Sequence, residues 1–135
     1  MKSLRWLWFP LGMAACVAGC GPSVEGRQLK GAEISTLFAD HTVKGHHEIG
    51  GYDFRSYYEP NGTFRSHQSN AKAPKTARWW VFEDDVCIEW DADPGPLCRT
   101  MVEQDGRYRK VLLLPKRAKT VVSFTAFIPG NPEGL

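Results

Sequence analysis

From residue 42 to residue 127 the chain alternates apolar and polar residues with a period of two, the repeat of a strand that buries one face. The alternation is clearest where Tyr52 and Phe54 lie on one side of a strand and Asp53 lies on the other. Turn-forming residues such as Asp-Gly and Pro-Asn-Gly interrupt the pattern about every ten residues. The pattern predicts strands at residues 42–48, 52–59, 63–69, 77–83, 86–91, 97–104, 107–114 and 120–127.

Consecutive strands joined by short turns predict a mainly β fold, a seven- or eight-stranded antiparallel meander that is barrel-like or half-open. Closure removes exposed strand edges, so the barrel is favoured. Before the first strand, residues 32–39 place Ile34, Leu37 and Phe38 at the spacing of one helix face. We expect a short N-terminal amphipathic helix that plugs one end of the sheet. Residues 79–82 are apolar on both faces, and the same helix is the candidate to cover the outer one.

The first 19 residues have the features of a secretory signal peptide. Lys2 and Arg5 precede an apolar run from Trp6 through Val17. That run is too short for a convincing spanning helix, and Pro10 interrupts it. The pattern predicts a leader that is removed from the mature protein.

The leader ends at Val17-Ala18-Gly19-Cys20, which resembles the lipobox of bacterial lipoproteins, where signal peptidase II cuts before the cysteine. The resemblance implies that Cys20 carries a thioether-linked diacylglycerol and an acylated amino group, with palmitate-type chains that anchor the protein to a membrane. A second cysteine, Cys16, lies in a weaker match, and an ordinary secretory leader is the alternative. Gly21 stands where an aspartate commonly signals inner-membrane retention in enteric bacteria. The resemblance therefore favours the periplasmic side of the outer membrane.

These assignments divide the chain into a signal peptide (1–19), a lipidated cysteine with a polar tether (20–29) and a single β domain (30–135). Removal of Lys2 and Arg5 from the 17 basic residues leaves 15, equal to the 15 acidic residues. The calculated pI near 8.4 therefore belongs mainly to the leader. A formally neutral mature chain carries no nucleic-acid signature, so we expect no nucleic-acid partner.

Cys87 and Cys98 remain as an even pair once Cys16 is removed and Cys20 is acylated, in a compartment that oxidises thiols. Ten residues separate them, about the length of two strand ends and a loop. We expect a disulfide across a hairpin, on the solvent side of its strand. Two unpaired buried cysteines are the alternative, and a zinc site is disfavoured because no second ligand pair lies at the required spacing.

Short motifs follow one another through the domain: Leu37 with Thr42–Gly45, Tyr57–Thr63, Trp79–Trp80, Val86–Trp90, Cys98 and Pro129–Leu135. Together they resemble a family of small secreted bacterial β domains of unknown function, over most of the mature chain. The resemblance implies a scaffold of turns and core residues and brings no catalytic residue. The sequence departs from that family in its long link from Ser69 to Thr76 and in its basic loop at 116–119.

The histidines cluster in the first third of the domain, at His41, His46, His47 and His67. If the first and third strands are neighbours, His46, Glu48 and His67 could bind a transition metal. Their spacing matches no known ligand motif, so surface histidines without a metal are the favoured interpretation.

Other chemistry has weaker signals. Carboxylates gather near two predicted turns, at Glu83–Asp85 and at Glu89, Asp91 and Asp93, without the contrast of environments that a two-carboxylate hydrolase needs. The chain has neither a G-x-S-x-G serine nor a glycine-rich phosphate loop. We expect no catalytic residue, no cofactor and no metal, and therefore not an enzyme.

Two groups of side chains could contact partners. The basic group lies on the seventh strand and the following loop: Arg107, Arg109, Lys110, Lys116, Arg117 and Lys119. It could bind anionic lipid head groups, although a solvated strand edge is the favoured interpretation. The aromatic group could line a ligand cavity, although core packing is favoured: Tyr58, Phe64, Trp80, Trp90, Tyr108 and Phe124.

The favoured function is therefore a lipid-anchored cell-envelope protein, a non-enzymatic binding or structural module whose partner is the membrane and, beyond it, anionic lipid or an envelope protein. A lipocalin-like carrier of a small apolar ligand is the first alternative. A periplasmic lysozyme inhibitor is the second, disfavoured because lysozyme is basic and this chain has no acidic excess.

Overall fold

The structure is a computed structural model that describes residues 24–135, apart from the side chain of Pro94. The leader and Cys20 lie outside the described residues. The elements are β1 (Arg27–Gln28), α1 (Gly31–Phe38), β2 (His41–His47), β3 (Tyr52–Tyr58), β4 (Thr63–Gln68), β5 (Lys75–Phe82), β6 (Asp85–Trp90), β7 (Asp93–Gln104), β8 (Arg107–Leu113) and β9 (Ala118–Pro129).

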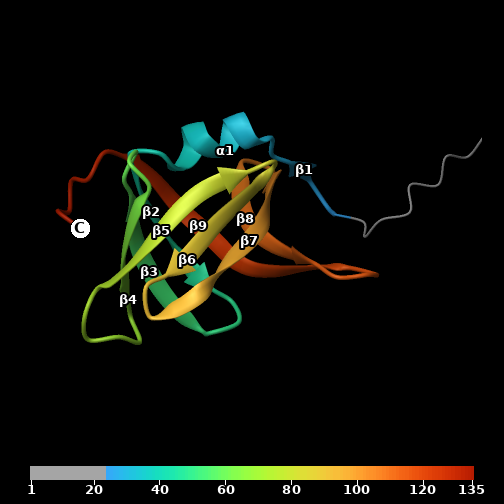
Figure 1. Cartoon of the computed structure of the whole chain (residues 1–135). Helices are drawn as coiled ribbons and strands as arrows, with labels where there is room; N and C mark the ends of the chain where they lie inside the picture. Colours follow the sequence, from blue (N-terminus) through green and yellow to red (C-terminus); the bar gives the residue numbers. More distant parts are fainter. Residues whose placement is uncertain (1–23) are drawn as a thin grey trace, which may run out of the picture.

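Strands β2 to β9 form a closed antiparallel barrel (Figure 1). Each of them pairs with the next strand in the sequence, and β9 returns to pair with β2. The predicted meander is confirmed, in its eight-stranded, closed form. Closure leaves each barrel strand with a neighbour on both sides for at least part of its length, which removes long exposed edges.

The predicted strand positions are confirmed to within a few residues, with two corrections. Asp93–Pro96, expected as a turn, opens β7, because Asp93 pairs with Trp90 across a tight turn. The last strand, expected to end near residue 127, continues to Pro129, which lies opposite His41.

A third correction concerns the tether, expected to extend to residue 29. Arg27 and Gln28 instead form β1. This strand pairs with Glu103 and Val102 of β7, beyond the part of β7 that pairs with β6. Leu29 is buried and its backbone N–H donates to the carbonyl of Met101 at 2.9 Å. The folded domain therefore begins a few residues earlier than the hydrophobic pattern indicated.

Helix α1 plugs one end of the barrel, as predicted (Figure 1). Its Ile34 and Phe38 are fully buried. The Phe38 ring lies 4.7 Å from the Tyr58 ring and 5.5 Å from the Phe127 ring, centroid to centroid. These tilted and edge-on contacts suit the quadrupoles of aromatic rings. The aromatic residues of this end are therefore core, as the favoured interpretation predicted for Tyr58, Phe64 and Phe124.

The helix start is fastened to the turn between β5 and β6. The backbone N–H of Gly31 donates to Asp84 Oδ1 at 2.8 Å, which places a carboxylate at the positive end of the helix. A Cβ on Gly31 would lie 2.2 Å from the carbonyl oxygen of Glu83. The helix can approach the barrel this closely only because residue 31 has no side chain.

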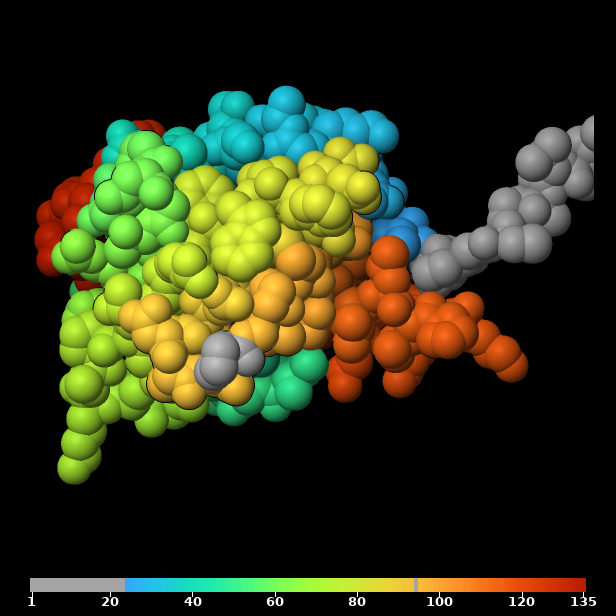
Figure 2. Space-filling model, viewed as in Figure 1, coloured from blue at the N-terminus to red at the C-terminus, as the bar shows by residue number. Residues whose placement is uncertain are grey.

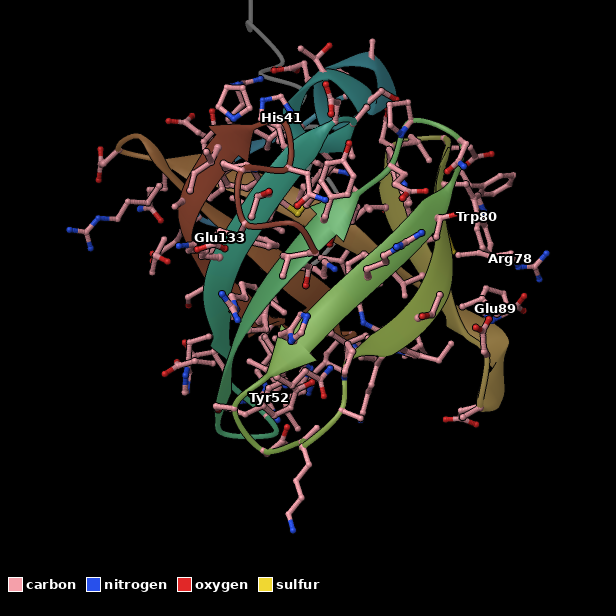
Figure 3. All side chains as sticks on the ribbon, turned by 90° about the vertical axis from the view of Figure 1, so that its left-hand side faces the viewer. His41, Tyr52, Arg78, Trp80, Glu89 and Glu133 are labelled. Atoms are coloured by element: carbon pink, nitrogen blue, oxygen red, sulfur yellow. A yellow bond between two sulfur atoms is a disulfide. The ribbon has the colours of Figure 1, made fainter. Side chains whose placement is uncertain are left out.

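The outer face of β5 is not covered by the helix, contrary to expectation. Phe82 is 59% exposed, and Trp80 is half-buried on the outer wall (Figure 3). Trp80 lies opposite Cys87 in the register of β5 and β6. The Trp80 indole therefore helps to cover this outer wall beside Cys87, because helix α1 lies over the barrel end instead.

The predicted disulfide is present, between Cys87 and Cys98, which are cross-strand partners on β6 and β7. It lies on the outward face of the strands, as the alternation predicted. Cys87 is nevertheless 0% exposed, so this part of the outer face is not a solvent side.

Candidate functional site

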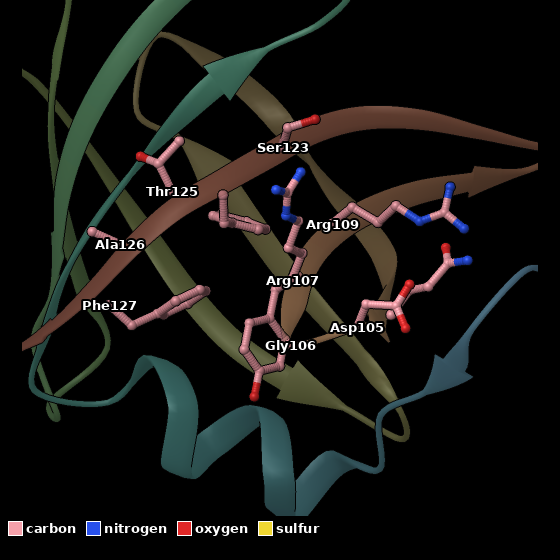
Figure 4. A pocket seen from close by; sticks show the side chains of 11 residues that line it. Asp105, Gly106, Arg107, Arg109, Ser123, Thr125, Ala126 and Phe127 are labelled. Carbon is pink, nitrogen blue, oxygen red and sulfur yellow. The ribbon is translucent and has the colours of Figure 1, made fainter.

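The barrel wall is split between β8 and β9 at the end that carries α1. The two strands pair from Leu113–Ala118 up to Arg109–Ser123, where the ladder stops. Beyond that pair β8 stays with β7 and β9 stays with β2, so the two strands diverge. Figure 4 shows this opening, with Arg107 on one side and Thr125 on the other. We call it the wall slot.

The wall slot encloses about 1040 Å³ and has an aromatic floor. Tyr108, Phe124 and Phe127 line it, and the Tyr108 and Phe127 rings lie 5.3 Å apart, centroid to centroid. One side is formed by β8 and the β7–β8 turn with Gly106, and the other by β9 with Ala126 (Figure 4). An aromatic floor between two strand edges offers both apolar contact and backbone hydrogen-bonding groups to a ligand.

Arg109 gives the wall slot an unsatisfied donor. Its guanidinium donates to Thr120 Oγ1 at 3.1 Å and to the carbonyl oxygen of Glu25 at 2.6 Å. Its third nitrogen, Nε, is buried and has no partner among the described residues. A buried donor without an acceptor costs about 1–3 kcal/mol, and because Nε is buried a ligand in the wall slot would reach it only after the Arg109 side chain moved.

A second, smaller cavity lies inside the barrel at the end opposite α1. It measures about 50 Å³, and we call it the chamber. Tyr58 and Phe64 line it on the side of the aromatic core, and Tyr52 lines it at the opposite end of the barrel (Figure 3). Because water needs about 10–15 Å³ of such space, the chamber holds only a few water molecules.

Lys110 reaches into the chamber and is only 8% exposed. It lies opposite Met101 and Val122, two buried residues of the neighbouring strands. Its Nζ sits 5.9 Å from the centroid of the Phe124 ring. Burial, and secondarily the positive charge of Arg99, lower the pKa of Lys110 to about 8. Because Phe124 also lines the wall slot, its ring lies between the chamber and the wall slot.

His47 lines the chamber beside Lys110 and stacks on Tyr52 with ring centroids 4.8 Å apart. The backbone N–H of Gly50 donates to His47 Nδ1 at 3.0 Å, so the neutral ring carries its proton on Nε2. Burial and then the Lys110 charge lower the pKa of His47, which keeps the ring neutral at pH 7.

The two histidines considered as metal ligands, His46 and His67, line one shallow pocket with Asp53 on the outside of the barrel, away from Glu48. His46 Nδ1 lies 2.7 Å from Asp53, while Glu48 accepts a hydrogen bond from Ser123 at 2.8 Å. His67 lies opposite Arg55 in the sheet register. In the part of the chain that the structure describes, no three His, Cys, Asp or Glu side chains are grouped so as to hold a metal.

The carboxylates near the turns have structural partners. Asp84 holds the helix start, and Asp85 accepts a hydrogen bond from the Thr100 hydroxyl at 3.2 Å. Glu89 pairs with Arg78 across β5 and β6 on the outer wall (Figure 3). Asp91 and Asp93 are exposed at the β6–β7 turn, as expected of a solvated hairpin end.

The predicted basic group is divided by the fold, and its Lys110 was misplaced. Lys110 faces the barrel interior, whereas Lys116, Arg117 and Lys119 are exposed at the tip of the β8–β9 hairpin. Arg109 belongs to the wall slot. The exposed tip projects from the body of the molecule (Figure 2).

The predicted aromatic group is divided as well. Trp90 lines the chamber and Tyr108 lines the wall slot, while Trp80 lies on the outer wall. Sequence reasoning missed the chamber because it treated Lys110 as one more charge in a basic run. The signal was present: Lys110 falls on the alternation that buries Tyr108 and Leu112 at least in part.

No helix within residues 24–135 is long and apolar enough to cross a membrane. The comparisons with known proteins return no relatives: no protein-family model, no curated protein and no solved structure matches this chain. The resemblance to a family of small secreted bacterial domains therefore stays a prediction.

Proposed function

We propose that this chain is a lipid-anchored, non-enzymatic binding module of the bacterial envelope that takes an extended segment of a partner protein into the wall slot. The observation that carries the proposal is the end of the β8–β9 ladder at Arg109 and Ser123, beyond which both strands run on without each other. Unpaired strand edges are templates for the addition of another strand.

The chemistry of the wall slot suits a polypeptide. An added strand would bring the backbone carbonyl and N–H groups that β8 and β9 do not give each other beyond Arg109 and Ser123. Its side chains would alternate between solvent and the floor made by Tyr108, Phe124 and Phe127. A partner segment with apolar residues at every second position is therefore the expected occupant.

A β-barrel is compatible with the alternative, a lipocalin-like carrier of a small apolar ligand, but the interior of this barrel offers such a ligand little room. Such ligands need cavities of about 300–1,000 Å³ with apolar walls. The chamber measures about 50 Å³ and contains a lysine, and the aromatic core fills the rest of the barrel. We therefore assign binding to the wall slot on the outside of the barrel and not to the barrel interior.

Anchoring through Cys20 completes the proposal. The first described residues run beside Arg109, which holds the carbonyl of Glu25, so the tether leaves the barrel next to the wall slot. A Cys20→Ala variant should appear in the soluble envelope fraction instead of the membrane fraction and should not incorporate labelled palmitate. Equal palmitate labelling of the variant would contradict the anchor.

The wall slot is tested with short random peptides displayed on phage and selected on the purified protein. Thr125→Trp places a large side chain at an exposed position of the slot and should weaken the selected peptides about tenfold or more. Thr76→Trp makes the same change at an exposed position of β5, on another part of the wall, and should leave binding unchanged. Peptides that bind both variants equally would show that the slot is not their site.

A second contact, with anionic lipid, is favoured by one observation. The tip of the β8–β9 hairpin, with Lys116, Arg117 and Lys119, extends to the same side as β1, from which the tether departs (Figure 1). A tethered barrel would therefore bring this tip near the head groups. Changing Arg117 and Lys119 to glutamate should reduce binding to phosphatidylglycerol vesicles, whereas the same change at Lys72 and Lys75 should not.

A further inference from the structure

The chamber contains a largely buried lysine whose ammonium group has no counter-ion among the described residues. Lys110 is 8% exposed, and among residues 24–135 its Nζ has neither a hydrogen-bond acceptor nor a carboxylate partner. The Phe124 ring, whose centroid lies 5.9 Å from Nζ, attracts the ammonium through a cation–π contact. Removing an ammonium from water costs several kcal/mol unless an anion and hydrogen bonds compensate.

The groups around Lys110 add positive charge and donors. Arg99, from β7, repels the Lys110 charge, and His47, from β2, presents a protonated Nε2. Tyr52 from β3 and Gln68 from β4 line the chamber with a hydroxyl and an amide, both of which can donate hydrogen bonds. The hydroxyls of Ser56 and Ser66 bond to each other at 2.8 Å.

No carboxylate of the described residues lines the chamber. Glu48 raises the pKa of His47, but it is the smallest of the four influences on that pKa. The Glu48 carboxylate accepts a hydrogen bond from the Ser123 hydroxyl. Asp53 faces the other side of β3, toward His46. Tyr58 stays protonated, because burial raises the pKa of its phenol. The chamber is therefore positively charged and rich in donors.

We propose that the chamber is a binding site for a short-chain monocarboxylate, with the Lys110 ammonium as its counter-ion. The carboxylate would accept hydrogen bonds from Lys110 Nζ, from the Gln68 amide and from the Tyr52 hydroxyl. The site is separate from the wall slot, and the inference does not depend on the proposed protein partner.

The size and walls of the chamber set the length of the ligand. About 50 Å³ accommodates a carboxylate with one or two carbon atoms attached. Ile88, Val122 and Trp90 offer apolar contact to such a short alkyl group. Tyr58 and Phe64 close the chamber on the side of the core, so a fatty acid would find no room for its chain.

The charge of Lys110 makes binding depend on pH. Its pKa is about 8 in the empty protein, so the ammonium form is dominant at pH 7 and is lost as the pH rises through 8. Because the carboxylate binds the ammonium form, its affinity should fall about tenfold for each pH unit above that value. Below pH 8 the affinity should change little until the carboxylate itself is protonated.

The test is isothermal titration calorimetry of the purified full-length protein with acetate at pH 7. Acetate should bind, and Lys110→Met, which keeps the side-chain length without the charge, should weaken it about tenfold or more. Lys75→Met removes an exposed lysine from β5, outside both proposed binding sites, and should leave the affinity unchanged. Chloride, phosphate and decanoate are titrated as competing ligands.

Several outcomes would overturn the proposal. Acetate binding that survives in Lys110→Met places the anion elsewhere, and no heat of binding up to about 100 mM acetate removes the site. Tighter binding of chloride or phosphate rejects the carboxylate class, and tighter binding of decanoate rejects the closed floor. If Lys110→Met does not fold, the pH profile of the native protein decides: an affinity that is constant from pH 7 to pH 10 contradicts the role of Lys110.

Discussion

At the scale of single residues, the informative side chains are those that a barrel interior does not usually tolerate. Lys110 occupies an inward position between Met101 and Val122, where an apolar residue would cost less. Arg109, its neighbour, keeps a buried Nε without an acceptor in the described part of the molecule. Each is a local loss of stability, and each lies at a candidate site.

Lys110→Met should stabilise the protein at pH 7 in buffers free of carboxylate, by about 1–4 kcal/mol, because an unpaired buried charge is replaced by an apolar group. The folded state lowers the pKa of Lys110 from 10.5 to about 8, so the unfolded chain binds more protons between these values. Native stability should therefore rise with pH over this window, and the advantage of the variant should shrink.

Urea unfolding at pH 7, 8.5 and 10 measures this difference. Lys119→Met serves as the control, since Lys119 is exposed and its loss should produce no such trend. A stability difference between native and Lys110→Met that stays the same from pH 7 to pH 10 would mean that the lysine is not desolvated in solution.

At the scale of elements, α1 acts as a plug and contributes more through Phe38 than through its own hydrogen bonds. A helix of eight residues is too short to be stable alone in water. It is held by the burial of Ile34 and Phe38 and by the bond between Gly31 and Asp84. The helix and the barrel end should therefore form together.

Phe38→Ala should destabilise the protein by about 3–5 kcal/mol, because it removes a fully buried ring and leaves a cavity among Tyr58, Phe124 and Phe127. Leu37→Ala, at the half-exposed neighbouring position, should cost clearly less. Thermal unfolding followed by near-UV circular dichroism measures both. Equal losses for the two variants would contradict the plug.

At the scale of the whole molecule, closure of the barrel and the disulfide limit the motions of the wall. The Cys87–Cys98 disulfide joins β6 to β7. Strand β7 also pairs with β1 and with β8, and β8 forms one side of the wall slot. The C-terminal residues fold back outside β2, where Glu133 binds Lys44 at 2.9 Å (Figure 3 labels Glu133). The slot is thus an opening in a wall that is braced by the disulfide on one side and by the C-terminal residues on the other.

Replacing both Cys87 and Cys98 by alanine should lower the free energy of unfolding by about 3 kcal/mol, from the entropy of the unfolded loop that the disulfide closes. The barrel should still form, since the strand register does not depend on the bond. Urea unfolding of the double variant, beside the native protein with and without reductant, measures the loss. A double variant as stable as the oxidised native protein would show that the bond constrains nothing in the unfolded chain.

The local features of this protein could be predicted from the amino-acid sequence: the strand and turn positions, the short helix and the partner of each cysteine in the described domain. These follow from hydrophobic periodicity, turn chemistry and the parity of cysteines, which are properties of neighbouring residues. The lipid anchor at Cys20 and its location in the envelope remain sequence-based predictions, because they lie outside the described residues.

The points at which neighbouring strands pair and separate could be seen only in the folded barrel. Strand lengths alone do not predict that β8 and β9 separate beyond Arg109–Ser123. The register of each pair depends on how all eight strands pair around the closed barrel. The same closure turned Lys110 inward and left Lys116 and Arg117 outside, although all three belong to one basic run. Both candidate sites thus arise from contacts between distant strands, which no stretch of sequence contains alone.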